Sequence, residues 1–204
     1  YFQAVGEWLI YDTLSVAKSP FAGQTFGLFI YVGLLLTLSA YCFKLLLGEW
    51  QSALLAFVNL LFIGIWLYPT NFSSPWFPHL HAITFLPFLL SWISIYKKKI
   101  TALPIFALSS VLLVHGHVSF ALFVGIISFL VLIHIKETAS SIKVSAHKFI
   151  LTYPRILWSS VGIIALGTLP IILHTAFHFP GEIPKYLAYS PDTSAHTWLS
   201  LIHI

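Results

Sequence analysis

The chain has 204 residues, of which 58% are hydrophobic and 8% are charged, and its mean hydropathy is +0.91. Soluble domains carry about 25% charged residues, so this chain lacks the polar surface of a water-soluble globule and is predicted to be an integral membrane protein. The formal net charge of +4 does not predict a nucleic-acid partner, because the basic residues gather in the segments between apolar runs.

The predicted fold class is all-α, a polytopic membrane helix bundle. The length accommodates about six spans of ~20 residues plus an interfacial N-terminal helix. We expect residues 1–204 to form a single transmembrane domain and to be a fragment of a longer membrane protein, because the final WLSLIHI starts another apolar run. The single cysteine, Cys42, excludes an intramolecular disulfide.

The apolar runs follow one another with short polar breaks. In residues 1–20, charged residues interrupt an aromatic, apolar pattern that ends at Ser19-Pro20, which favours an interfacial helix. A polar loop, KETASSIKVSAHK, is expected from residue 136. The predicted spans cover residues 26–43, 52–68, 81–96, 100–114, about 118–135 and 156–173.

An uncharged, proline-rich and aromatic stretch, PTNFSSPWFPHLH, separates the second span from the third. Aromatic rings favour the headgroup level of a membrane, so this stretch at residues 69–81 is predicted to lie at the membrane surface. An ordinary interfacial turn with Trp76 as its anchor explains the same pattern.

The run from residue 100 to residue 135 is interrupted by His115-Gly116-His117. Residues 100–114 cover only ~22 Å at 1.5 Å per residue, less than the ~30 Å hydrocarbon core. Glycine permits a tight turn, and we predict two helices joined by a hairpin there. One long broken helix is the alternative.

The hairpin distributes the basic residues more unevenly between the two membrane faces than the single broken helix does. One side then carries eight basic residues and the other side two, and the positive-inside rule makes the first side cytoplasmic. Residues 97–99 and 136–155 are therefore expected inside the cell, and residues 69–79, 115–117 and 174–196 outside it. The eight are Lys44, Lys97, Lys98, Lys99, Lys136, Lys143, Lys148 and Arg155, and the two are Lys18 and Lys185.

Three histidine pairs fall on the predicted outer side. Only the last pair has the four-residue spacing that places two side chains on one helix face, whereas zinc requires three or four ligands. We therefore predict no metal site, and interfacial or hydrogen-bonding roles instead. The pairs are His79 with His81, His115 with His117, and His174 with His178.

The segment SSPWFPHLHAITFLPFLLSWISIYKKKITALPIFALSSVLLVHGHVSFALFV resembles the middle of GT-C-type membrane glycosyltransferases, the dolichyl-phosphate-mannose/aminoarabinose transferase-like group. Trp76, Pro78 and His79 match the element that opens an outer-face helix in that group. Gly116-His117-Val118-Ser119 occupies the place of its hinge, with His115 where many relatives have glutamine. The tail LPIILHTAFHFPGEIPKYL is also similar, and the resemblance covers roughly residues 70–190.

The resemblance implies an enzyme, in full-length form, that transfers a sugar from a polyprenyl-phosphate donor at the outer face of the cell membrane. Its catalytic acidic residue, which sometimes works with a divalent metal, would lie in an outer loop that this sequence does not contain. The chain would therefore contribute scaffold and substrate-site wall, with Trp76, His79 and His117 as the substrate-binding residues and an unknown catalytic residue. The expected partners are the lipid bilayer and a lipid-linked sugar donor.

Two other classes of protein fit the same composition. A transporter or channel-like protein would bind a small solute or a metal in an outer cavity, but transporters usually carry ionisable residues at mid-membrane. The predicted spans contain almost none, with Asn59 and Ser91 as their strongest polar candidates. A purely structural membrane subunit is the third possibility.

Overall fold

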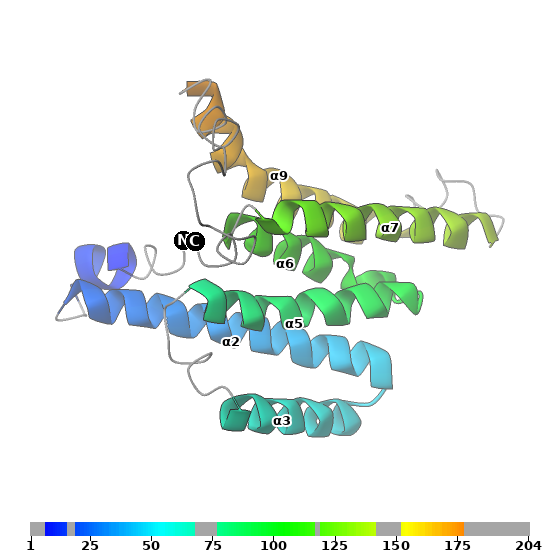
Figure 1. Ribbon diagram of the computed structural model, residues 1–204, viewed down its shortest axis with the longest axis horizontal. Coiled ribbons are helices and arrows are strands. Elements are labelled where there is room, and N and C mark those ends of the chain that lie inside the picture. Colours follow the sequence, from blue (N-terminus) through cyan, green and yellow to red (C-terminus); the bar gives the residue numbers. More distant parts are fainter. Residues whose placement is uncertain (1–6, 16–18, 68–76, 117–118, 142–151, 178–204) are drawn as a thin grey trace, which may run out of the picture. The chain divides into compact units, whose positions relative to one another are not determined.

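The structure is a computed structural model that describes residues 7–15, 19–67, 77–116, 119–141 and 152–177. Every regular element in these ranges is a helix (Figure 1), which confirms the all-α prediction. The chain divides into two compact units, Tyr1–Ile164 and Ala165–Ile204, with the boundary inside the last described helix. The expectation of a single domain over residues 1–204 stays a prediction.

The first long helix, α2, spans Pro20–Leu47 and is longer than the predicted 26–43. Ser19 caps it, because its hydroxyl accepts a hydrogen bond from the Ala22 N–H at 3.3 Å, and Pro20 fits the first helical position. The helix ends at Gly48, whose φ of 84° is a left-handed conformation. The Ser-Pro pair taken to close the N-terminal segment is thus the start signal of this helix.

The remaining helices correspond to the predicted apolar runs. A short π-helix, η1 (Glu7–Thr13), lies in the segment predicted to be an interfacial helix. Most of the proline-rich stretch, residues 68–76, lies outside the described residues. The others are α3 (Trp50–Leu67), α5 (Phe77–Tyr96), the 3-10 turn η2 (Ile100–Ala102), α6 (Leu103–Gly116), α7 (Ser119–Ser141) and α9 (Pro154–Phe177).

The end of α7 corrects the predicted loop boundary. The polar segment was expected to be a loop from residue 136, yet α7 continues to Ser141. Lysine, glutamate and alanine are good helix formers, and the segment KETASS contains no helix-breaking proline or glycine. The helix therefore continues through this segment.

Helices α6 and α7 form the predicted hairpin. One helix ends at Gly116, the next begins at Ser119, and the two pack against each other. In Figure 1 they run in opposite directions, as a hairpin requires and a single broken helix does not.

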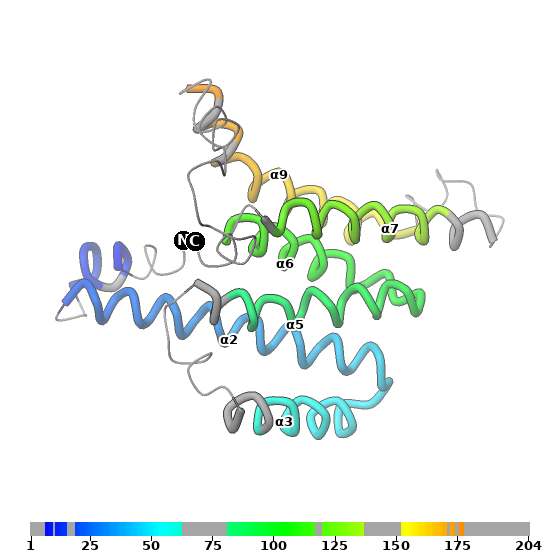
Figure 2. Tube along the Cα trace, viewed as in Figure 1, coloured from blue at the N-terminus to red at the C-terminus, as the bar shows by residue number. Residues whose placement is uncertain are grey.

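Helix direction alternates through the unit formed by Tyr1–Ile164. In Figures 1 and 2, α2, α5 and α7 run one way, and α3 and α6 run the other way. One end of the unit therefore carries the starts of α2, α5 and α7 and the end of α6; we call it the histidine end, after His79, His81 and His115. The opposite end is called the lysine end, after Lys44, Lys97–Lys99 and Lys136.

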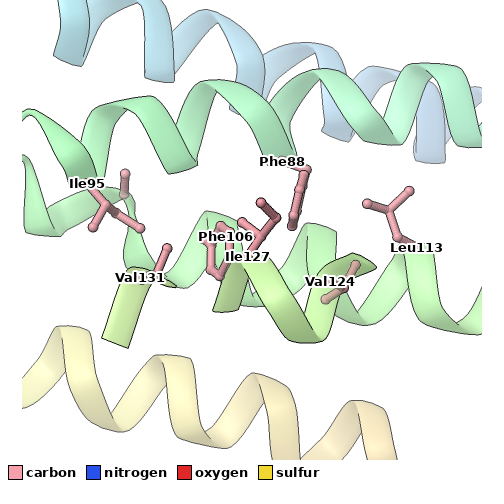
Figure 3. Close-up of a cluster of buried hydrophobic side chains, with 8 residues drawn as sticks. Phe88, Ile95, Phe106, Leu113, Val124, Ile127 and Val131 are labelled. Carbon is pink, nitrogen blue, oxygen red and sulfur yellow. The ribbon is translucent and has the colours of Figure 1, made fainter. Parts of the chain in front are cut away.

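The main hydrophobic core lies between α5, α6 and α7 (Figure 3). Its members recur at intervals of three, four or seven residues on each helix, the spacing of one helix face. The rings of Phe88 and Phe106 stack at its centre, with 5.1 Å between centroids. The cluster consists of Phe88, Ile95, Ala102, Phe106, Leu113, Val124, Ile127 and Val131.

Small hydroxyl residues allow α2, α5 and α6 to pack closely. Ser39, Ser94 and Ser109 are fully buried, and each donates its hydroxyl proton to a backbone carbonyl one turn earlier, at 2.7–2.8 Å. This bond satisfies the hydroxyl of each of these three serines within its own helix, whereas the buried Ser110 hydroxyl has no partner within the described residues. Small residues that let helices approach closely are typical of helix contacts in membranes.

The outer surface of the helices is strongly apolar. Large side chains such as Phe29, Phe62 and Leu122 are more than 70% exposed. By length and composition, one helix in the described part of the chain, α2, is long and apolar enough to cross a membrane, and it lies near the N-terminus. Shorter apolar helices are found at Trp50–Phe62, His81–Tyr96, Ile100–Gly116 and Phe120–Lys136.

Candidate functional site at the histidine end

The three predicted substrate-binding residues lie at or beside the histidine end. Trp76 precedes α5 and His117 follows α6, and both are outside the described residues. His79 lies in the first turn of α5, whose backbone is described there. These three assignments stay predictions.

His81 makes the contacts that join the helices at this end. A Cβ atom placed on Gly116 would stand 1.7 Å from Nε2 of His81, so the imidazole lies directly against the glycine backbone. The same ring lies 5.1 Å from the ring of Phe120, centroid to centroid. One histidine therefore connects the start of α5, the end of α6 and the start of α7.

A side chain at position 116 would force the His81 ring to move. Any larger residue there would occupy the volume of the His81 ring. The HGH sequence thus combines a helix end with a surface that accepts an imidazole from another helix.

Two polar pairs lie near the histidine end, one between α2 and α5 and one between α2 and η1. The hydroxyls of Tyr31 and Thr84 share a hydrogen bond of 2.5 Å, and Thr84 lies three residues after His81 on the same side of α5. Closer to the end, Gln24 donates a hydrogen bond of 2.7 Å to the Glu7 carboxylate. This end therefore offers imidazole, hydroxyl and amide groups together with the carboxylate of Glu7.

The histidines differ in the surroundings that the structure gives them. His81 and His115 are both half-buried, at the start of α5 and at the end of α6. His174 lies in α9, and His178 is outside the described residues. No group of three or more histidine, cysteine or acidic side chains lies together within the ranges that the structure describes.

Sequence reasoning selected His79 and did not identify His81 or the Tyr31–Thr84 pair. The two histidines belong to the same HLH pattern, and the contact of His81 with Gly116 depends on the packing of α6 against α5. Tyr31 and Thr84 are 53 positions apart, so no local spacing connects them. A tyrosine and a threonine within two apolar runs were the available signal, and such residues are common in membrane helices.

Comparisons with family models, with curated proteins and with solved structures gave no match.

Proposed function

We propose that this chain is a polytopic membrane helix bundle and that, in its full-length protein, the histidine end lines an outer-face site for a polyprenyl-phosphate sugar donor. The proposal has two parts, a membrane location and a transferase role. Each part has its own support and its own test.

The distribution of charge supports the membrane location. Between Pro20 and Ile135, the described helices carry no acidic residue, and the only basic residue within one of them is Lys44, in the last turn of α2. Water-exposed helices normally alternate charged and apolar faces, whereas here the exposed faces are apolar. Hydrocarbon is the environment that stabilises such a surface.

The helix lengths fit the same environment. At 1.5 Å per residue, α3, α5 and α7 measure ~27, ~30 and ~35 Å, against a hydrocarbon thickness of ~30 Å. Helix α6 with its preceding 3-10 turn measures ~27 Å.

The distribution of basic residues supports the orientation. Lys44, Lys97–Lys99 and Lys136 gather at one end of the unit, while Glu7 and Asp12 of η1 lie at the other, where η1 packs on α2. By the positive-inside rule, the lysine end would face the cytoplasm and the histidine end the outside.

The contact between His81, Gly116 and Phe120 is the single observation that carries the transferase role. It joins the start of α5 to the end of α6 and the start of α7, and these are the helix ends beside which the WFPH and GHVS elements lie in the sequence. A sugar-phosphate site needs aromatic surface for the sugar and donors for the phosphate oxygens. The joined segments contain both kinds of group.

A transfer assay tests this role. Full-length wild type, Trp76→Ala and His117→Ala are reconstituted in proteoliposomes with a radiolabelled polyprenyl-phosphate sugar. Loss of one donor to developing charge lowers turnover by about 10²–10³, so His117→Ala should reduce transfer by that factor, and Trp76→Ala should weaken sugar binding. Thr37→Ala, on the exposed side of α2, is the matched control and should retain wild-type transfer.

Three outcomes would contradict the proposal. Wild-type rates in both folded variants would reduce Trp76 and His117 to interfacial anchors. A wild type that transfers no sugar but moves a solute across the bilayer would establish a transporter instead. Release of the chain from membranes by alkaline carbonate would refute the membrane location itself.

A further inference from the structure

The end of α5 is a turn built from three consecutive lysines. The N–H groups of Lys97, Lys98 and Lys99 donate to backbone carbonyls of the last turn of α5 at 3.0, 2.8 and 2.9 Å, so the backbone of the turn is satisfied. All three side chains are exposed. The backbone thus holds three positive charges together at the lysine end.

Lys98 has a left-handed backbone, with φ of 63°. This conformation favours glycine, or asparagine, over residues with longer side chains. Helix α2 ends at the same end of the unit with Gly48 in the left-handed region, which is the usual solution. A lysine at position 98 is therefore not favoured by the backbone conformation there.

An aromatic stack lies beside these lysines. Tyr96 stacks on His134 of α7, with 4.5 Å between ring centroids and 20° between ring planes. Tyr96 is 66% exposed, whereas Nε2 of His134 is buried and has no hydrogen-bond partner within the described residues. The stack holds the Tyr96 ring directly before the first of the three lysines in the chain.

Exposed apolar side chains lie about one helical turn before the stacked rings, one on α5 and one on α7. Ile93 lies three residues before Tyr96 on α5, and Leu130 lies four residues before His134 on α7; both are exposed. A ligand with a charged head and an apolar tail would meet lysines, an aromatic ring and then aliphatic side chains, in that order.

We propose that Tyr96 and Lys97–Lys99 form a binding site for the headgroup of an anionic phospholipid, with the acyl chains against Ile93 and Leu130. Positive charge complements the phosphodiester, and tyrosine is favoured at the membrane interface. The exposed apolar side chains of Ile93 and Leu130 favour a lipid over a soluble phosphate. This site rests on the membrane location proposed above and not on the transferase role.

Native mass spectrometry of the detergent-solubilised full chain tests the site. The lipids are phosphatidylglycerol and the zwitterionic phosphatidylcholine, and glycerol phosphate serves as a soluble competitor. Each lysine near an anionic headgroup contributes about fivefold in affinity. Wild type should therefore retain phosphatidylglycerol preferentially, Lys98→Asn should bind it about fivefold more weakly, and K97Q/K98N/K99Q about 100-fold more weakly.

Lys98→Asn separates binding from folding. Asparagine adopts the left-handed conformation readily, so this variant should unfold at the wild-type temperature or above it. The control Lys98→Arg retains the charge and should bind like wild type. A second control, Lys44→Gln, removes one charge from the same end but from α2, and should lower the affinity by less than Lys98→Asn.

Equal retention of both lipids by wild type, or unchanged affinity in the triple variant, would overturn the site. Competition by glycerol phosphate at concentrations similar to those of the lipid would show a soluble-anion site instead. Carbonate extraction reports on the membrane location independently. A chain that stays in the membrane but does not prefer phosphatidylglycerol refutes this site alone.

Discussion

At the scale of single residues, the most constrained contact is the one between His81 and Gly116. The imidazole occupies the space in which a side chain at position 116 would begin. A motif that includes a glycine between two histidines therefore has a packing role in addition to any chemical role. The contact also explains why the start of α5 and the end of α6 stay together.

Gly116→Ala should destabilise the protein. Its Cβ would displace the His81 ring from Phe120, and overpacking of this kind costs about 1–3 kcal/mol. Gly125, in the interior of α7, has open space where its Cβ would lie, so Gly125→Ala should raise stability by up to ~1 kcal/mol through helix propensity. Thermal unfolding in detergent compares the two.

A double-mutant cycle identifies the cause. If the clash with His81 is responsible, His81→Ala should recover part of the stability lost in Gly116→Ala, with a coupling energy of ~0.5–3 kcal/mol. Additive effects, or a Gly116→Ala protein as stable as Gly125→Ala, would show that the ring accommodates the methyl group.

At the scale of elements, close helix packing through small residues holds α2, α5 and α6 together. The hydroxyl-bearing residues at these contacts bond within their own helix, so they contribute small size and not bonds between helices. The Tyr31–Thr84 pair is an exception, because it joins α2 to α5 directly. Packing density, more than polar contact, therefore sets the separation of these helices.

Ser39→Leu should separate α2 from its neighbours. Ser39 is fully buried, and a leucine there adds volume to a filled interface, at a cost of about 1–3 kcal/mol in the free energy of unfolding. Thr37 lies two residues earlier on the exposed side of α2, with its hydroxyl bonded to the Gly33 carbonyl in the same way. Thr37→Leu is the matched control and should change stability by less than ~0.5 kcal/mol.

Chemical or thermal unfolding in detergent measures both leucine variants. Equal stabilities would mean that the buried face of α2 adapts to a larger side chain, and that close packing does not determine the arrangement of the helices.

At the scale of the whole molecule, the proposed membrane location depends on how charge and apolar surface are arranged. The helices of the unit Tyr1–Ile164 present apolar sides, and their lysines gather at one end. The proposed orientation, the proposed lipid site and the proposed sugar-donor site all depend on this polarity. It is therefore the property to measure first.

The orientation predicts different labelling at two positions. In a Cys42→Ser background, a single cysteine replaces either Ser73, in the predicted outer stretch, or Ser141, at the end of α7. Intact cells are treated with a membrane-impermeant thiol reagent. Ser73→Cys should be labelled and Ser141→Cys should not, until the cells are permeabilised; the reverse pattern would invert the topology and with it both proposed sites.

The sequence by itself determined the all-α fold, the approximate position of each helix, with boundaries that differ by up to six residues, and the hairpin at Gly116. These features depend on local composition, because proline, glycine and apolar periodicity act within one or two turns of the chain. The start of α2 was misplaced, since Ser19-Pro20 ends one segment and begins the next.

Only the tertiary structure decided which groups meet. Contact of His81 with Gly116 and Phe120, the Tyr31–Thr84 bond and the Tyr96–His134 stack all join residues on different helices. The sequence of a helix of nearly uniform apolarity does not indicate which side faces a neighbour, because its exposed side is as apolar as its packed side. The rotation of each helix about its axis, and therefore the composition of each site, is fixed by side-chain packing between helices.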